Sequence, residues 1–454
     1  MPILGGTLAF ARFHVAGGSP KRLDDRLLDR LREHRIGNRR GARGEEEVGW
    51  IGGRHLLDRE FDIEKNVILD CLHFGMRIDA SRVPPDVLHA YVQMELDSLL
   101  KDGSAEVNRP RRSAPDRDSA GDSSLDDAGD STQRPRGRAF ARLKKQAVDA
   151  ARNRATQEIK DGRYRSMRQV PILWDTRNDT LFVGATTPAI IERLIPLFRE
   201  TFDKRLEPVT AGGFAYHWAE KCGLSRRLES MQCPKFVEHP AGNGHIDVYW
   251  TARDPNSRDY LGNEFLLWLW YVLAEESDTI ELADKSEASF VIVKQLAVEC
   301  PWAESGKAVF SADGPASLPE SRRAIQTGKL PRRAGLMLSR QGEQYEFTLQ
   351  AETLNVSGGV LPKIESNGNP RATIEERIEQ VRHLTQTIDL LYASYLTRRV
   401  SDQWPELFER MKAWLTSAPS PTPRSAPLRQ DSPDVAAARD QAVVSNEQPD
   451  PVSL

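Results

Sequence analysis

The sequence predicts an α+β protein with mixed sheets, packed helices and two folded regions of similar size. Segments that alternate apolar and polar residues, as strands do, are interspersed with segments whose apolar residues recur every three or four positions, as in amphipathic helices. The chain has 454 residues, which exceeds the usual size of a single domain. Two stretches, residues 103–137 and 417–454, contain almost no large apolar residues. We therefore expect two folded regions with an insertion and a tail.

The first folded region, residues 1–102, shows an α+β pattern. A strand is predicted over Thr7–Val15, and a helix from Lys21 to Arg32 carries Leu23, Leu27, Leu28 and Leu31 on one face. The predicted elements that follow are a short strand at Val48–Ile51, a strand over Lys65–Arg77 and a helix from Pro84 and Pro85 to Leu100.

The segments 103–137 and 417–454 are predicted to be a disordered insertion and a disordered tail. Both are rich in Ser and Pro, and the insertion also in Asp and Arg. Such segments bury too little apolar surface to offset the loss of chain entropy on folding.

Residues 138–211 are predicted to complete the first region. A helix over Ala139–Lys160 leads into a hairpin of two strands, Gln169–Trp174 and Thr180–Val183, joined by the turn at Asp175 to Asn178. The next helix, Pro188–Phe202, is expected to bury a stripe of Ile190, Ile191, Leu194, Ile195 and Phe198.

Residues 212–416 are predicted to form a second α+β domain. It contains an aromatic-rich helix at Tyr260–Glu275 and strands at Ala288–Val298, Gly335–Arg340 and Tyr345–Gln350, of which the last two form a hairpin. A long amphipathic helix at Thr373–Thr397 either packs within this domain or pairs with a second subunit.

Composition excludes several classes of protein. The chain has 63 Lys and Arg against 66 Asp and Glu, a formal charge of -3, which excludes a wholly basic DNA-coating protein. Its four cysteines include no C-x-x-C pair, which argues against a structural zinc site and a disulfide framework and favours a reducing cytoplasm. No long uncharged apolar run and no export signal are recognised, so we expect a soluble, cytoplasmic protein without a membrane partner.

The search for catalytic motifs finds no phosphate loop, no nucleophile elbow and no metalloprotease motif, and no cofactor is predicted. One candidate is a carboxylate cluster of Asp175, Glu158 and Asp161, which could bind Mg²⁺ in a nuclease. The favoured alternative is that Asp175 forms the turn that it begins, because Asp at this position bonds to nearby backbone. We expect a protein that is not an enzyme, with nuclease activity as an alternative.

Positive charge is concentrated in the segment Arg138–Arg168, which has ten basic residues and three acids, a net charge of +7. A protein that is not basic overall can engage a phosphate backbone in this way. The predicted DNA-binding residues are Arg142, Lys144, Lys145, Arg152, Arg154, Arg163, Tyr164, Arg165 and Arg168. Tyr164 could stack on a base or enter a base step. The alternative is a solvated helix face with Tyr164 packed in the core.

Several motifs in residues 4–210 resemble the recombination-associated protein RdgC family in order and spacing. They are the strand LAFARFHV, the Gly49-Trp50 pair, the helix start Val83-Pro84-Pro85-Asp86-Val87, the stretch from Arg163-Tyr164 to Trp174-Asp175-Thr176, and the segment Leu206-Glu207-Pro208-Val209. Beyond Gly212 the chain does not align with the family.

This resemblance implies a DNA-binding protein of the bacterial nucleoid that forms a ring-shaped dimer, binds double-stranded DNA with little sequence preference and restrains recombinase filaments. Tyr164 falls where the family has an aromatic finger residue, and the basic helix before it falls where the family has a Lys- and Arg-rich helix. The alternatives from other classes are a metal-dependent nuclease and a protein-interaction scaffold that assembles through the helices Thr373–Thr397 and Tyr260–Glu275.

Overall fold

The computed structural model divides the chain into two compact units, Met1–Pro208 and Val209–Leu454, each of which contains helices and strands. It describes residues 3, 5–38, 46–107, 138–233, 236, 257–301, 306–364 and 368–417, without the side chains of 102–107 and 138–139. The α+β class predicted from the sequence is therefore confirmed.

Unit 1 contains an antiparallel sheet with the strand order β7-β1-β6-β5-β4-β2, and β3 pairs with β4. Its strands are β1 (Leu8–Ala16), β2 (Glu47–Ile51), β3 (Val67–Ile68), β4 (Cys71–Ser81), β5 (Arg165–Asp175), β6 (Thr180–Val183) and β7 (Arg205–Pro208). The helices α1 (Asp25–Glu33) and α5 (Pro188–Phe202) pack with the sheet in one hydrophobic core. The predicted hairpin around Asp175 is confirmed as β5 and β6.

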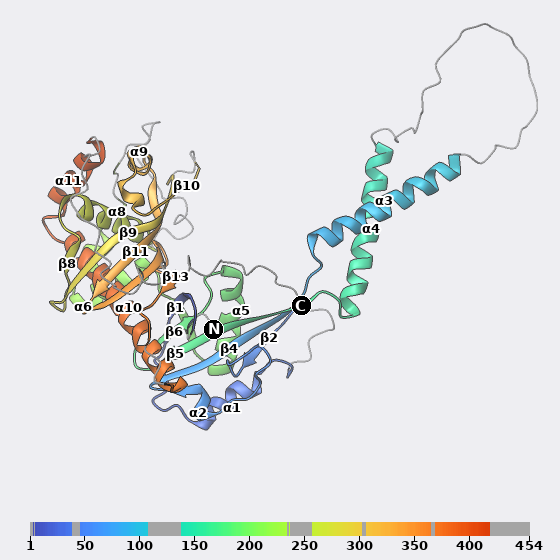
Figure 1. Cartoon of the computed structure of the whole chain (residues 1–454), viewed down its shortest axis with the longest axis horizontal. Helices are drawn as coiled ribbons and strands as arrows, with labels where there is room; N and C mark the ends of the chain where they lie inside the picture. The colour runs from blue at the N-terminus through green and yellow to red at the C-terminus, as the bar shows by residue number, and fades with distance from the viewer. Residues whose placement is uncertain are drawn as a thin grey trace, which may run out of the picture. The chain divides into compact units, whose positions relative to one another are not determined.

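The sheet of unit 1 is antiparallel at each pairing of its described strands, where a mixed sheet was predicted. The longest connection between two consecutive strands of this sheet runs from β4 to β5. Two helices, α3 (Pro85–Val107) and α4 (Arg138–Lys160), run out from β4 and back to β5, as Figure 1 shows. A connection that goes out and returns starts β5 where β4 ended, which makes the two strands antiparallel.

Three predicted elements of unit 1 are wrong in detail. The helix predicted from Lys21 begins at Asp25, because Asp24 caps it by accepting a hydrogen bond from Leu27 N. In the buried stripe of α5, Leu197 takes the place predicted for Ile195, which is exposed.

The strand predicted over Lys65–Arg77 is split into α2 (Ile63–Asn66), β3 and β4. Asp62 caps α2, and Leu69 adopts a left-handed backbone with φ of 52° between β3 and β4. A run of apolar residues does not reveal such a reversal of the chain.

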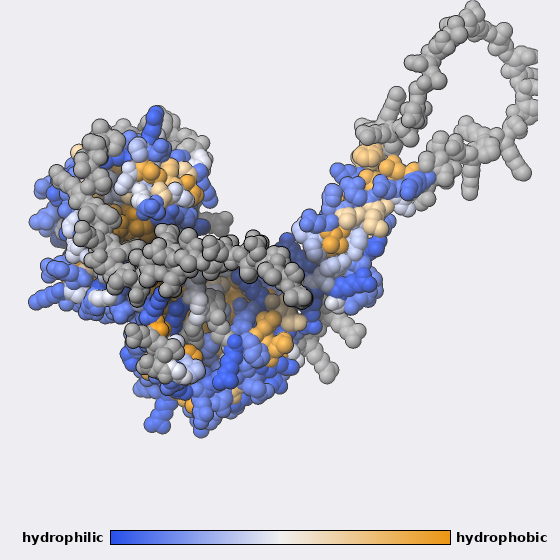
Figure 2. Space-filling model, viewed as in Figure 1, coloured by the Kyte–Doolittle hydropathy of each residue, from blue (hydrophilic) through white to orange (hydrophobic). Residues whose placement is uncertain are grey.

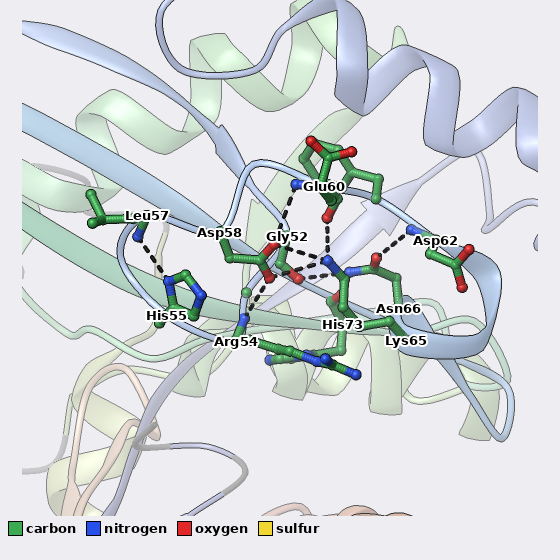
Figure 3. A network of polar contacts seen from close by, with 12 residues as sticks. Gly52, Arg54, His55, Leu57, Asp58, Glu60, Asp62, Lys65, Asn66 and His73 are labelled. Atoms are coloured by element: carbon green, nitrogen blue, oxygen red, sulfur yellow. Dashed lines mark hydrogen bonds and ion pairs between the residues drawn. The ribbon is translucent and has the colours of Figure 1, made fainter.

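The segment between β2 and β4, which includes α2 and β3, is held by the polar network in Figure 3. The fully buried Asn66 donates to the carbonyl oxygens of Gly52 (2.8 Å) and His73 (2.6 Å) and accepts from the backbone N of Asp62 (2.9 Å). The Asp58 carboxylate accepts from Lys65 Nζ at 3.0 Å. Burial is the main reason that the pKa of His73 is lowered to about 4, so His73 is neutral at pH 7.

We expect Asn66→Ala to lower the free energy of unfolding of unit 1 by about 2–4 kcal/mol, because it removes three hydrogen bonds, two of which are to the carbonyls of the buried Gly52 and His73. Urea denaturation of the full chain measures this loss. The exposed Asn38, which donates to Arg32 O at 2.8 Å, supplies the control. A loss for Asn66→Ala no larger than that for Asn38→Ala would contradict the role assigned to Asn66.

The helix α3 extends to Val107, so residues 103–107 of the predicted insertion are helical. Extending a helix is far easier than starting one, and Ser104, Ala105 and Glu106 do not interrupt it. The rest of the predicted insertion, 108–137, and residues 418–454 of the predicted tail lie outside the described residues.

Unit 2 contains an antiparallel sheet with the order β10-β9-β11-β12-β13, and β8 pairs with β9. The predicted hairpin is confirmed, with Gln341 and Gly342 both at positive φ in its turn. The strands are β8 (Thr279–Glu281), β9 (Glu287–Glu299), β10 (Ala308–Ala312), β11 (Leu330–Arg340), β12 (Glu343–Gln350) and β13 (Val356–Val360). The helices are α6 (Ala211–Cys222), α7 (Ser225–Glu229), α8 (Tyr260–Glu275), α9 (Pro319–Gln326), α10 (Pro370–Arg399) and α11 (Trp404–Thr416), with a 3-10 turn at Pro315–Ser317.

The two helices considered for assembly pack within unit 2. α8 is buried from Tyr260 to Val272, and α10 contacts α6 and α8. The predicted stripe of α10 is buried from Ile378 to Tyr395. Of the two possibilities for this helix, packing within its own domain is the one observed.

Candidate nucleic-acid interface

The helical hairpin of α3 and α4, which we call the arm, carries most of the predicted DNA-binding residues. Its two helices contact each other, and Ala147, Ala151 and Ala155 form a buried row on α4. Positions three or four apart lie on one face of a helix, so this row marks the side of α4 that is turned inward. Small side chains there allow two helices to approach closely.

The opposite side of α4 carries four basic residues. At about 100° per residue, Arg142, Lys145, Arg152 and Lys160 fall within an arc of about 80° opposite the alanine row. All four are exposed, and none forms an ion pair with another described residue. We call these four residues the basic face. It extends over about 27 Å of the helix axis, because Lys160 lies 18 positions after Arg142 at about 1.5 Å each.

Two further charged residues of α4, Lys144 and Asp149, differ in their position on the helix relative to the basic face. Lys144 is exposed but falls on the same side of the helix as the alanine row, so it is not part of the basic face. Asp149 is exposed within the arc of the basic face and lowers its charge. Lys160 belongs to the face although it was not among the predicted residues; its spacing from Arg142 was the sequence signal that could have identified it.

Three of the predicted DNA-binding residues gather around Glu158, near the end of α4. Tyr91, on α3, and Tyr164 donate hydrogen bonds from their hydroxyls to Glu158 Oε2 at 2.6 and 2.8 Å. Arg163 NH1 lies 3.3 Å from Glu158 Oε1, and Arg154 Nε lies 3.7 Å from the same oxygen. Arg154 also lies over the Tyr91 ring, 4.3 Å from its centroid.

Tyr164 is therefore a member of a polar cluster, where either a free aromatic finger or a core residue was expected. Its hydroxyl is 2.9 Å from that of Tyr91. These hydrogen bonds raise the pKa of Tyr164 and lower the pKa of Glu158, because they favour the neutral phenol and the ionised carboxylate. Tyr164 and Gly162 both have positive φ, so the chain turns sharply here between α4 and β5.

Arg165 and Arg168 lie on the exposed first part of β5. Arg165 NH2 donates to Asp79 Oδ2 at 2.9 Å, and Asp79 is buried in a bidentate pair with Arg77. Arg168 is exposed and forms no ion pair with another described residue. The structure thus separates the nine predicted residues into five without carboxylate partners in the described chain and four whose polar groups already bind a carboxylate.

The visible surface of the arm mixes hydrophilic and hydrophobic residues, as Figure 2 shows. Met94 on α3 and Phe140 on α4 are exposed, with 54% and 38% of their surface accessible. Within the described chain, α4 packs against one side of α3, which leaves part of the apolar surface of α3 open.

The carboxylates proposed for a nuclease are not brought together. Glu158 and Asp161 precede β5, whereas Asp175 is its last residue, about 33 Å further along an extended strand of this length. Asp175 Oδ1 accepts from Arg177 N at 3.1 Å, and Oδ2 accepts from Asn178 Nδ2 at 2.8 Å. This is the turn-forming role that was favoured from the sequence. Within the described residues, no group of three or more His, Cys, Asp or Glu side chains is arranged to hold a metal ion.

In the part of the chain that is described, no helix is both long and apolar enough to span a bilayer. No protein-family model matches this chain, and no curated protein shows significant sequence similarity to it.

Proposed function

We propose that the protein is a non-enzymatic, RdgC-like DNA-binding protein that binds double-stranded DNA with little sequence preference through the basic face of the arm. The basic face carries the proposal, since it presents four cations that have no carboxylate partner among the described residues. Arg168 adds a fifth such cation close to the arm. Contacts to phosphates of this kind give affinity without reading the base sequence.

The dimensions of the basic face fit this partner. Its length of about 27 Å corresponds to about eight base pairs at 3.4 Å each. Four phosphate contacts would give a slope of about −3.6 in a plot of log affinity against log salt concentration, at about −0.9 per contact.

The direct test is fluorescence anisotropy of a labelled duplex of random sequence, titrated with the protein across a salt series. We expect binding at low salt with a slope between about −3 and −5 and equal affinity for unrelated sequences. The titration is repeated with Mg²⁺, and the strand is then checked on a denaturing gel. Loss of the strand only with Mg²⁺, and its prevention by Asp175→Asn, would support the nuclease instead. No binding at low salt would make the basic face a solvated surface.

Further parts of the proposal rest on the resemblance to the RdgC family: a homodimer, a nucleoid-associated location in the cytoplasm, and a role in restraining recombinase filaments during DNA recombination. Sedimentation equilibrium tests the dimer. Strand exchange by a recombinase, measured with and without the protein, tests the last role. If the protein forms an oligomer but does not bind DNA near physiological salt, the result would favour the alternative function of a protein-interaction scaffold.

A further inference from the structure

Two arginines of the predicted DNA-binding set face an acid of the same chain. The Oε1 atom of Glu158 lies 3.3 Å from Arg163 NH1 and 3.7 Å from Arg154 Nε. The two arginine side chains are 66% and 43% exposed, whereas that of Glu158 is 11% exposed. Both arginine side chains are therefore accessible to solvent while they lie next to the carboxylate.

The other oxygen of Glu158 has a separate task. Oε2 accepts hydrogen bonds from the hydroxyls of Tyr91 and Tyr164, which join α3 and the corner before β5 to the end of α4. Through Oε2, Glu158 joins the parts at the base of the arm, and through Oε1 it places a single negative charge next to two arginines. A change that removes the negative charge of the carboxylate but keeps an acceptor oxygen for the two tyrosines can separate these roles.

A DNA phosphate and the Glu158 carboxylate would compete for the same two arginines. A phosphate that approaches Arg154 or Arg163 must replace an anion that is already next to it, and it meets the repulsion of the Glu158 carboxylate. Ion pairs at such exposed arginines are weak, so they can be broken by a polyanion. On the other side of α4, no residue of the basic face forms an ion pair with a described residue, although Asp149 lies within its arc.

We propose that Glu158 sets the affinity of the arm for DNA, because its carboxylate competes with phosphates for Arg154 and Arg163, which form a reserve pair of phosphate-binding residues. This inference rests on the proposed DNA-binding function. The inference gives an acidic residue, Glu158, a role in DNA binding that a search for basic residues would not find. It predicts that removal of the Glu158 charge strengthens binding.

The test uses the full chain, a random-sequence duplex and the salt series described above. Glu158→Gln keeps an oxygen that can accept from both tyrosines but removes the negative charge. We expect its affinity to rise about three- to tenfold at 0.1 M salt, with a slope steeper by up to about 1.8 for two added phosphate contacts. Tyr91→Phe removes a hydroxyl that donates to Glu158 and keeps the acid with both arginines, so its slope is expected to equal that of the unmodified protein.

A double-mutant cycle distinguishes the release of two arginines from a general change of charge. In the unmodified protein, Arg154→Gln with Arg163→Gln is expected to change affinity less than about twofold. In the Glu158→Gln background, the same pair of changes is expected to abolish the gain. Thermal unfolding followed by circular dichroism verifies that each variant is folded.

The outcomes separate the two proposals. If the unmodified protein does not bind the duplex at low salt, the proposed function is wrong, and this inference is wrong with it. If it binds but a folded Glu158→Gln variant shows equal or lower affinity, the inference alone is overturned and Glu158 serves only to hold the arm. An equal loss from the arginine pair in both backgrounds would also overturn it, because the arginines would then contact phosphate regardless of Glu158.

Discussion

Charge reversal of Lys145 and Arg152 together is expected to lower affinity for all duplexes by at least about 50-fold at 0.1 M salt. Each phosphate contact on B-DNA contributes about 1.2 kcal/mol at this salt concentration through counterion release, so two lost contacts amount to about 2.4 kcal/mol. The two new acids add repulsion to this loss. The salt slope is expected to become shallower by about 1.8. Anisotropy titrations of Lys145→Glu/Arg152→Glu with several unrelated duplexes measure both quantities.

Matched variants make this result specific to the basic face. Lys21→Glu/Arg22→Glu reverses two exposed cations before α1 and is expected to change affinity less than about twofold. Lys144→Glu, at a position next to Lys145 but on the other side of α4, is expected to have a smaller effect than Lys145→Glu. Asp149→Asn is expected to strengthen binding, because Asp149 lies within the arc of the face. Equal losses for Lys144→Glu and Lys145→Glu would show that the face is defined wrongly.

Removal of Arg399 is expected to lower the free energy of unfolding of unit 2 by about 3–5 kcal/mol. Arg399 Nε lies 2.6 Å from Glu264 Oε1 between α10 and α8, and both side chains are buried. Without Arg399, Glu264 remains as a buried carboxylate that has lost the cation paired with it in the described structure. Urea denaturation followed by Trp fluorescence measures the loss in Arg399→Met. Met keeps an unbranched stem at this position and removes the guanidinium group.

The neighbouring Arg398 provides the control, since it is 46% exposed and pairs with Glu276 at 3.2 Å. Arg398→Ala is expected to cost less than about 1 kcal/mol. A similar loss in both variants would contradict the importance given to the buried pair.

The cost of Arg399→Met is also expected to depend on pH. Burial raises the pKa of Glu264, and Arg399 opposes this effect, so the variant has the higher folded-state pKa. A carboxyl whose pKa is raised by folding binds its proton more readily in the folded protein, and it destabilises the fold as pH rises through that pKa. The loss is therefore expected to be largest at neutral pH and to shrink as pH falls toward the ordinary Glu pKa of about 4.3.

Much of the fold could be predicted because its elements depend on local patterns. The bounds of α5 at Pro188–Phe202 were predicted from its apolar spacing and from the proline at its start. The helix predicted around Tyr260–Glu275 was recognised from its aromatic and apolar run, and the structure confirms it. The hairpins around Asp175 and Gly342 followed from turn residues between apolar strands. The split of the predicted strand Lys65–Arg77 was missed, because it depends on the backbone reversal at Leu69.

The concentration of positive charge can be read from the amino-acid sequence alone, since the segment Arg138–Arg168 has ten basic residues and three acids, a net charge of +7. Which of these cations lie next to a carboxylate depends on how distant segments of the chain pack together. Tyr91 reaches Glu158 across 67 positions of the chain, and Asp79 reaches Arg165 across 86. Periodicity describes the faces of one element, whereas ion pairs between distant segments arise only when packing brings those segments together.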